Sequence, residues 1–155
     1  MPALGPRGVG WVVLQSLVFG VLVVCGLLGP GWPERAESSL RAAGIGLEAS
    51  GAVLSALGVR GLGSAFTPFP LPLEHADLRR NGIYSQVRHP VYGGIVVFAL
   101  GVSLWRSPLA LVPTALLAGV FELKSRREEL WLAERYPEYA AYRAATPRRF
   151  IPWVI

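Results

Sequence analysis

An uninterrupted apolar run near the N-terminus constrains the fold more than any other feature of this sequence. It extends over Val9–Gly29, 21 residues without a charged side chain. A helix of this length rises about 31 Å, which matches a hydrocarbon core of about 30 Å. The run is longer than the apolar core of a typical signal peptide, and no small-x-small cleavage pattern follows it. It therefore predicts a membrane-spanning helix that the protein retains.

Three further apolar segments follow this run, at Ala42–Val59, Val91–Trp105 and Pro108–Leu123. Little more than a Ser-Pro break separates the last two, which predicts a tight helical hairpin. Both are short and are expected to borrow flanking residues or to thin the membrane. The chain is 52% hydrophobic and only 16% charged, whereas soluble domains carry about a quarter charged residues. The predicted fold class is therefore all-α, a multi-pass integral membrane protein with about four transmembrane helices.

The basic residues predict how these helices are oriented. If both termini are cytoplasmic, 12 of the 15 Lys and Arg residues lie on that side, and only Arg35, Arg41 and Arg106 lie opposite. This distribution fits the positive-inside tendency of membrane proteins. It places the Leu62–His89 loop and the segment after Leu123 together on the cytoplasmic side.

The segment after the fourth apolar run predicts a helical cytoplasmic tail. Helical character should continue through FELKSRREELWLAERY, because the pairs Glu122–Arg126 and Lys124–Glu128 have the i, i+4 spacing that supports a helix. PEYAAYRAAT then predicts a second, short amphipathic helix. We interpret residues 1–155 as a single membrane domain.

Two features of the second apolar segment suggest packing or function. Ala42, Gly46 and Ser50 form a small-residue stripe at i, i+4, i+8 spacing, which lets helices approach closely in lipid. Glu48 places a carboxyl group inside the same segment. Such a group is either functional or lies near the interface and bonds to a neighbour.

The motif RHPVYGG opens the third apolar segment. His89 should be extended because proline follows it, and Pro90 suits the first position of a helix. The backbone N–H groups of Val91, Tyr92 and Gly93 would then form an anion-binding helix start. A basic, proline-capped anchor at the membrane interface is an equally valid interpretation of the same residues, and Arg88 is assigned that anchoring role.

The adjacent pair Glu128–Glu129 is the second cluster of interest. Neighbouring helical side chains point about 100° apart, so the two carboxylates need not share a partner; a solvated charged face is the alternative. Two histidines and one cysteine leave a zinc site short of ligands. A soluble basic face for nucleic acid is also missing from the pattern. Neither a metal nor a nucleic-acid partner is expected.

Taken together, these motifs resemble the isoprenylcysteine carboxyl methyltransferases and the related phospholipid methyltransferases of membranes. The resemblance depends on NGIYSQVRHPVYGG, the following hairpin, EELWLAERYPEYAAY and PRRFIP, in that order. It covers Thr67 to Pro152, more than half of the chain. Residues 67–152 would form the cofactor-binding core, and residues 1–66 correspond to the variable N-terminal spans of such proteins.

The resemblance implies S-adenosylmethionine as cofactor, held in a cytoplasmic pocket that the tail closes. The implied cofactor-binding residues are Asp77, Leu78, Arg79, Tyr84, His89, Pro90, Val91, Tyr92, Glu128 and Glu129. Lys124 matches a position linked to substrate, so Lys124 and Glu128 are the expected catalytic residues. That position is often arginine, and lysine cannot form the same fork with a carboxylate. The spacing of the YPEY segment also differs by one residue, and Tyr139 and Tyr142 receive no site role.

The function implied is methyl transfer to a lipophilic or amphiphilic small molecule at the membrane, such as a prenylcysteine carboxylate or a lipid amine. Membrane lipid is the expected partner, and no oligomeric state is predicted. Two alternatives remain at this point. One is a small four-span transporter with Glu48 as a proton or cation site. The other is a non-catalytic membrane binding module that has the motifs but binds no cofactor.

Overall fold

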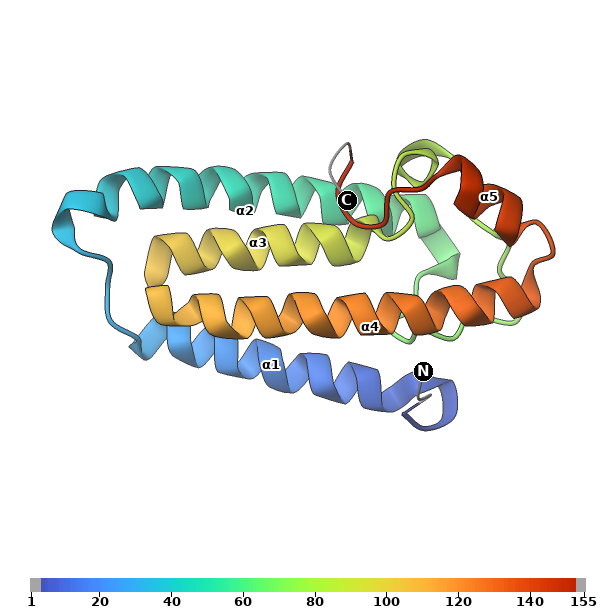
Figure 1. Ribbon diagram of the computed structural model, residues 1–155, viewed down its shortest axis with the longest axis horizontal. Helices are drawn as coiled ribbons and strands as arrows, with labels where there is room; N and C mark the ends of the chain where they lie inside the picture. Colours follow the sequence, from blue (N-terminus) through green and yellow to red (C-terminus); the bar gives the residue numbers. More distant parts are fainter. Residues whose placement is uncertain (1–3, 153–155) are drawn as a thin grey trace.

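The computed structural model describes residues 4–152, and every regular element in that range is helical. The α-helices are α1 (Val9–Leu28), α2 (Glu34–Leu62), α3 (Pro90–Arg106), α4 (Leu111–Arg135) and α5 (Tyr139–Ala145). The first four lie side by side in one layer, in the spatial order α2, α3, α4, α1 (Figure 1). The predicted all-α fold class is confirmed.

Among residues 4–152, three helical segments are long and apolar enough to cross a membrane: Pro6–Leu28, Glu34–Ala65 and Pro108–Arg135. The predicted second segment begins earlier than expected, because the helix starts at Glu34 directly after Pro33. The fourth reaches spanning length because α4 continues through the charged stretch to Arg135, as predicted. α3 has 17 residues and rises only about 26 Å, so it is the short helix of the layer.

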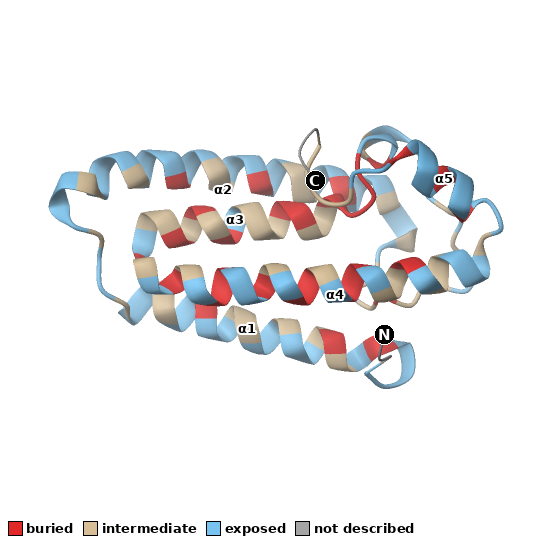
Figure 2. Ribbon diagram, viewed as in Figure 1, coloured by how far each residue is buried: buried red, intermediate tan, exposed pale blue. Residues whose placement is uncertain are grey.

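The outer surface of the layer is apolar. On α1, Leu17, Leu27 and Leu28 are 64%, 66% and 82% exposed. Buried residues instead concentrate along α3 and α4 and where the tail folds back (Figure 2). Lipid tails solvate such exposed leucines as well as a protein core does, so the pattern is that of an integral membrane protein.

α2 and α3 approach each other along glycines seven residues apart. Gly44 packs on Gly101, and Gly51 packs on Gly94. A Cβ atom on Gly51 would lie 2.5 Å from the Gly94 carbonyl oxygen, which leaves no room for a side chain. Seven residues are nearly two helical turns, so both contacts fall on one face of each helix. The helices can therefore pack backbone against backbone.

The predicted packing stripe on this helix is wrong. Ala42, Gly46 and Ser50 are all exposed, and a Cβ on Gly46 would meet nothing within 4 Å among the described residues. Gly44 and Gly46 are about 200° apart around the helix axis, so the two sets lie on nearly opposite faces. The glycines of α3 decide which small-residue face of α2 is used.

The end of the layer is closed by two irregular segments. α4 has 25 residues and α3 has 17, so the last turns of α4 extend beyond the start of α3 (Figure 1). The loop 66–81 and the tail after α5 occupy this end. In the tail, the Arg148 carbonyl accepts from the Arg88 N–H at 3.1 Å, and the Arg149 carbonyl accepts from the His89 N–H at 2.7 Å. The predicted meeting of loop and tail is thus observed.

Candidate active site

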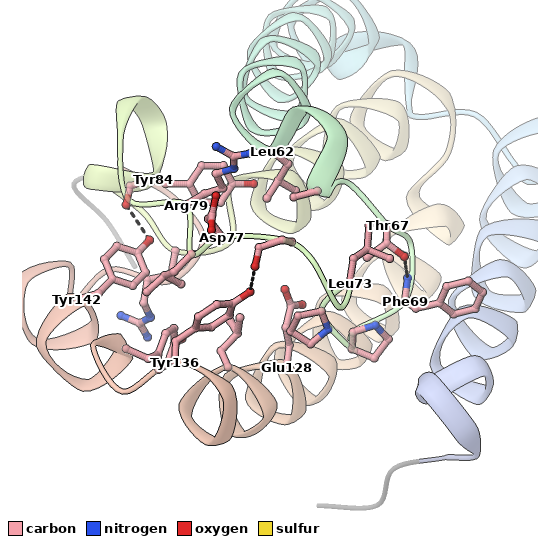
Figure 3. A pocket seen from close by; sticks show the side chains of 18 residues that line it. Leu62, Thr67, Phe69, Leu73, Asp77, Arg79, Tyr84, Glu128, Tyr136 and Tyr142 are labelled. Atoms are coloured by element: carbon pink, nitrogen blue, oxygen red, sulfur yellow. Dashed lines mark hydrogen bonds between the residues drawn. The ribbon is translucent and has the colours of Figure 1, made fainter.

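A pocket of about 90 Å³ lies where the end of α2, the loop 66–81, α4 and α5 meet (Figure 3). We call it the loop pocket. Its wall combines apolar with polar side chains, among them Leu62, Phe69, Leu73, Asp77, Arg79, Tyr84, Glu128 and Tyr142. A mainly apolar cavity with a few converging polar groups is typical of a small-molecule site.

Half of the residues predicted to bind a cofactor border this pocket. These are Asp77, Leu78, Arg79, Tyr84 and Glu128. The first three follow the loop, Tyr84 comes from the 3-10 turn Gly82–Ser85, and Glu128 faces them from α4. The other five do not border it; they are His89, Pro90, Val91, Tyr92 and Glu129. Two of these five are nevertheless bonded to residues of the wall.

Tyr92 connects the start of α3 to Glu128. Its hydroxyl donates to Glu128 Oε2 at 2.7 Å, and its ring stacks on Phe121 with 4.8 Å between ring centroids. The Glu128 side chain is 24% exposed, so it keeps access to the pocket while Tyr92 fixes one of its oxygens. A positioned carboxylate with one free oxygen is able to bind a cationic group.

Glu129 points away from Glu128, as the 100° separation predicts, although His89 lies between them with Nδ1 3.9 Å from Glu128 Oε2. Glu129 Oε1 accepts from Arg88 Nε at 2.9 Å and lies 3.2 Å from His89 Nε2. The side chains of Glu129, Arg88 and His89 are all about 5% exposed. Glu129 therefore joins the RHPVYGG motif to α4 in the interior and does not contact the pocket.

Arg88 differs from its predicted role as a surface anchor. It is buried, borders the loop pocket, and donates through Nη1 to the carbonyl oxygens of Thr146 and Pro147 at 2.6 and 2.7 Å. The tail supplies these acceptors, because it folds back across the start of α3. Burial of the guanidinium is possible since Glu129 and the two carbonyls satisfy it.

The start of α3 is built as predicted but is covered by the tail. Pro90 is the first helical residue, and His89 has φ −128° and ψ 60°, outside the helical region. The Gly93 N–H, expected to be free for an anion, donates to the His89 carbonyl oxygen at 3.1 Å. A Cβ on Gly93 would lie only 2.0 Å from the Phe150 carbonyl oxygen. A segment of the protein itself thus occupies this helix terminus.

Lys124 is buried in a site of neutral acceptors. It is 1% exposed, and Nζ donates to Gln15 Oε1 at 2.6 Å and to the Pro68 carbonyl at 2.8 Å. The ammonium also lies 5.0 Å from the centroid of the Tyr92 ring, on which a cation–π contact is favourable. Lys124 therefore links α1, the loop and α4, and it is not among the residues that border the loop pocket.

Three tyrosines of the pocket wall received no site role from the sequence. They are Tyr136, Tyr139 and Tyr142. The Tyr136 hydroxyl donates to the Ala76 carbonyl, and the Tyr142 hydroxyl donates to the Tyr84 carbonyl at 2.7 Å. The one available signal was that the spacing of Tyr139 and Tyr142 puts them on one helix face.

Burial raises the pKa of two tyrosine hydroxyls of the pocket wall, Tyr142 and Tyr84. It raises the pKa of the Tyr142 hydroxyl to about 12. Burial also raises the pKa of Tyr84, and the nearby charge of Glu128 adds to this effect. Both hydroxyls stay protonated at neutral pH, so they are hydrogen-bond donors there and not proton acceptors.

The structure also bears on two further features of the sequence, its metal-ligating side chains and Glu48. Within residues 4–152, no group of three or more His, Cys, Asp or Glu side chains could hold a metal ion. Glu48 is half-buried, and its Oε1 is buried without a hydrogen-bond partner in the described part of the chain. It lies 14 residues before Leu62, about 21 Å along α2 from the pocket.

Comparison with known proteins gives one family match. A family model described as phospholipid methyltransferase matches residues 40–139, which is 100 of the 155 residues. The matched range contains most of α2, the loop, α3, α4 and the first residue of α5. No curated protein matches the chain significantly.

Proposed function

Given that this chain belongs to the phospholipid methyltransferase family, we propose that it transfers a methyl group from S-adenosylmethionine to a lipophilic or amphiphilic acceptor at the membrane. One observation carries the proposal: Asp77, Arg79, Tyr84 and Glu128, from three separate segments of the matched range, converge on one pocket. A prenylcysteine carboxylate and a lipid amine are the acceptor classes considered.

The chemistry of the pocket wall fits such a cofactor. S-adenosylmethionine carries an ammonium, a carboxylate, a sulfonium and an adenine ring. The Glu128 oxygen that Tyr92 does not hold suits the ammonium, and Arg79 suits the carboxylate through a charge-assisted fork. The tyrosines offer flat faces and hydroxyl donors for the adenine. When bound, the cofactor supplies an activated methyl group on its sulfonium.

The pocket must enlarge before it can hold a ligand of this size, because small-molecule sites usually enclose about 300–1,000 Å³. A second hollow of about 730 Å³ shares Ala65, Leu73, Asp77 and Arg79 with the loop pocket. The loop 66–81 separates the two spaces. Two side chains at the end of α4 hold this loop. Arg135, the last residue of α4, donates to the Glu74 carbonyl, and Tyr136, the next residue, donates to the Ala76 carbonyl. A shift of the loop would join the two hollows.

In this proposal, the residues of the pocket act mainly by orienting the methyl donor and the acceptor. Methyl transfer is an in-line displacement, so alignment of donor and nucleophile supplies much of the acceleration. Tyr84 and Tyr142 stay protonated and His89 faces Glu129, so none of the three is placed to deprotonate an acceptor in the pocket. This arrangement favours an acceptor that is already nucleophilic, such as a carboxylate or an unprotonated amine.

Lys124 remains a proposed contact for the acceptor, and its surroundings limit how it would act. Its ammonium would reach an anionic acceptor only after Pro68 or Gln15 moves away. In the present arrangement Lys124 holds the loop and the face of Tyr92, and through Tyr92 it positions Glu128.

Titration of S-adenosylhomocysteine into the detergent-purified protein tests the proposal. We expect binding to the wild type, and a loss of at least tenfold in affinity for Glu128→Ala, because the ammonium partner is removed. Glu134→Ala is the matched control, since it removes an exposed carboxylate from the same helix. Absence of binding to folded wild-type protein would refute the methyltransferase proposal and leave the transporter and the binding module.

Once binding is shown, radiolabelled S-adenosylmethionine identifies the acceptor class. Transfer of label to a prenylcysteine, to a lipid amine or to neither separates the candidates directly. Glu48→Gln should leave this transfer unchanged, because Glu48 lies about 21 Å from the pocket along α2. A loss of transfer in that variant would mean that the site extends along the helix layer.

A further inference from the structure

A further hollow, different from the 730 Å³ hollow beside the loop 66–81, is lined by arginines and shares a wall with the loop pocket. It has a volume of about 540 Å³ and is formed by the end of α4, α5 and the tail. Arg88, Arg143 and Arg149 line it, together with Tyr139 and small apolar residues. We call it the arginine hollow. Arg88 and Tyr139 also border the loop pocket, so their side chains form the shared wall between the two spaces.

The arginine hollow has more positive than negative charge. Glu129 lies 2.9 Å from Arg88, 3.4 Å from Arg149 Nε and 3.8 Å from Arg143. Arg149 also pairs with Glu122, a carboxylate that Arg126 shares. The three arginines that line the hollow therefore face two carboxylates, which leaves an excess of one positive charge. Arginine cannot lose its proton in a protein, so the excess persists at every physiological pH.

One buried donor at the hollow has no acceptor among residues 4–152. The Tyr139 hydroxyl is buried and lacks a hydrogen-bond partner among residues 4–152, although Tyr139 is only 2% exposed. Arg149 Nε is also buried, and a carboxylate oxygen, Glu129 Oε1, lies 3.4 Å from it. Buried donors normally find acceptors. An orphaned hydroxyl donor beside excess positive charge points to an anion with several acceptor oxygens as the missing partner.

We propose that the arginine hollow binds a phosphate group, as the headgroup of an anionic membrane lipid or as free phosphate. A phosphate has enough oxygens to accept from Tyr139, Arg149 and Arg143 together, and guanidinium forks match its geometry. A lipid is an available source because the chain lies in a membrane and the hollow is at one end of the helix layer. The site is separate from the proposed reaction and does not depend on it.

A bound phosphate would join three parts of the chain. Tyr139 and Arg143 belong to α5, Arg149 to the tail, and Arg88 precedes α3. The tail carbonyls already hold Arg88 in place. A phosphate bridging Arg143 and Arg149 would therefore stabilise the tail in its position across the start of α3.

Thermal unfolding in nanodiscs tests the proposal. The protein is compared in phosphatidylcholine discs and in discs that also contain phosphatidylglycerol, each with and without inorganic phosphate at constant ionic strength. We expect the anionic lipid, free phosphate or both to raise the Tm of the wild type by several degrees, because a ligand that binds only the native state stabilises it. A shift with phosphatidylglycerol alone identifies the lipid headgroup, and an equal shift with free phosphate identifies a soluble ligand.

Three variants test whether the rise in Tm comes from binding in the arginine hollow. Arg143→Gln and Tyr139→Phe should lose at least half of it, and Arg143→Gln is suited to this test because that side chain is 59% exposed. Arg80→Gln is the control, since it removes the same charge from an exposed site outside the hollow. Equal shifts in all three variants would overturn the proposal. So would abolition of the shift by S-adenosylhomocysteine, since the hollow would then belong to the cofactor site.

Discussion

Glu128 and Glu129 show how adjacent residues acquire different roles. Both are glutamates in one turn of α4, yet Glu128 keeps an oxygen at the pocket and Glu129 is enclosed by Arg88 and His89. The difference arises because neighbouring helical side chains diverge by about 100°. One carboxylate is thus available for a ligand, and the other stabilises the fold.

Substitution of each glutamate should therefore have a different effect. Glu129→Gln leaves Arg88 buried without its charge partner, and breaking a buried ion pair costs about 3–5 kcal/mol. We expect a large drop in Tm for Glu129→Gln and a small one for Glu128→Gln, measured by thermal unfolding in detergent. Similar Tm values for the two variants would show that the Arg88–Glu129 pair does not stabilise the native state.

The buried tyrosines predict a loss of stability at alkaline pH. The Tyr142 pKa rises from 10.0 to about 12 on folding, mainly through burial. Between these values the unfolded state has released a proton that the folded state keeps, so stability falls as pH rises from about 10 to 12. The slope for one such tyrosine approaches about 1.4 kcal/mol per pH unit.

Tm measured between pH 9 and 12 checks this expectation, with tyrosinate absorbance followed in parallel. Tyr142→Phe should show a shallower decline than the wild type, because the titrating group is gone. Its Tm at neutral pH should be lower, since the bond to the Tyr84 carbonyl is lost. A wild-type Tm that stays constant up to pH 12 would contradict the assigned burial of these hydroxyls.

At the scale of elements, α2 and α3 pack backbone against backbone. The two helices meet at Gly44–Gly101 and Gly51–Gly94, where backbone atoms leave no space for a Cβ. Helix association in lipid depends on such close packing, because the surrounding tails remove the usual hydrophobic drive. The pocket depends on this contact, since α2 contributes Leu62 to the wall and α3 carries Tyr92, which bonds to Glu128 of the wall.

Two alanine substitutions on α2 separate packing from helix propensity. Gly51→Ala places a methyl group 2.5 Å from the Gly94 carbonyl oxygen, so we expect a clear fall in Tm. Gly46→Ala meets no atom within 4 Å in the described structure, and there alanine should raise Tm slightly through its better helix propensity. Thermal unfolding of the two variants side by side is the measurement. A fall for Gly46→Ala equal to that for Gly51→Ala would argue against the observed helix face.

At the scale of the whole molecule, the C-terminal tail completes the candidate site. It bonds to Arg88 and His89 through its backbone, and it supplies two carbonyl acceptors to the Arg88 side chain. The family match ends at residue 139, before this tail. The site therefore depends on contacts between residues about 60 positions apart in the sequence.

Gly93→Ala tests this dependence. The new methyl group would lie 2.0 Å from the Phe150 carbonyl oxygen, so the tail has to move. We expect weaker binding of S-adenosylhomocysteine, because Arg88 and Glu129 lose their neighbours, while the helix content seen by circular dichroism stays the same. Gly119→Ala on α4, which has open space around it, is the control. Unchanged affinity in Gly93→Ala would mean that the tail is not needed for the site.

Much of this architecture could be predicted from local sequence. Apolar runs are long enough to indicate their own helices, Pro90 sets the start of α3, and the predicted Glu122–Arg126 pair forms on α4. Lys124, in contrast, bonds to Gln15 and Pro68 and not to Glu128. The 100° rule predicts that Glu128 and Glu129 diverge. The predictions that hold depend only on residues close together in the chain.

The tertiary structure alone decided which helix faces pack together and which groups pair with each side chain. The spacing of small residues pointed to the face of α2 that carries Gly46, whereas the glycines of α3 select the face that carries Gly44 and Gly51. Arg88 looked like a surface anchor because its acceptors, the carbonyls of Thr146 and Pro147, lie 58 and 59 residues away. Local sequence sets backbone geometry and the direction of each side chain, but burial and charge pairing depend on which distant segment arrives opposite. For that reason the sequence determined the helices and the motifs, whereas the fold determined which motif residues border the pocket.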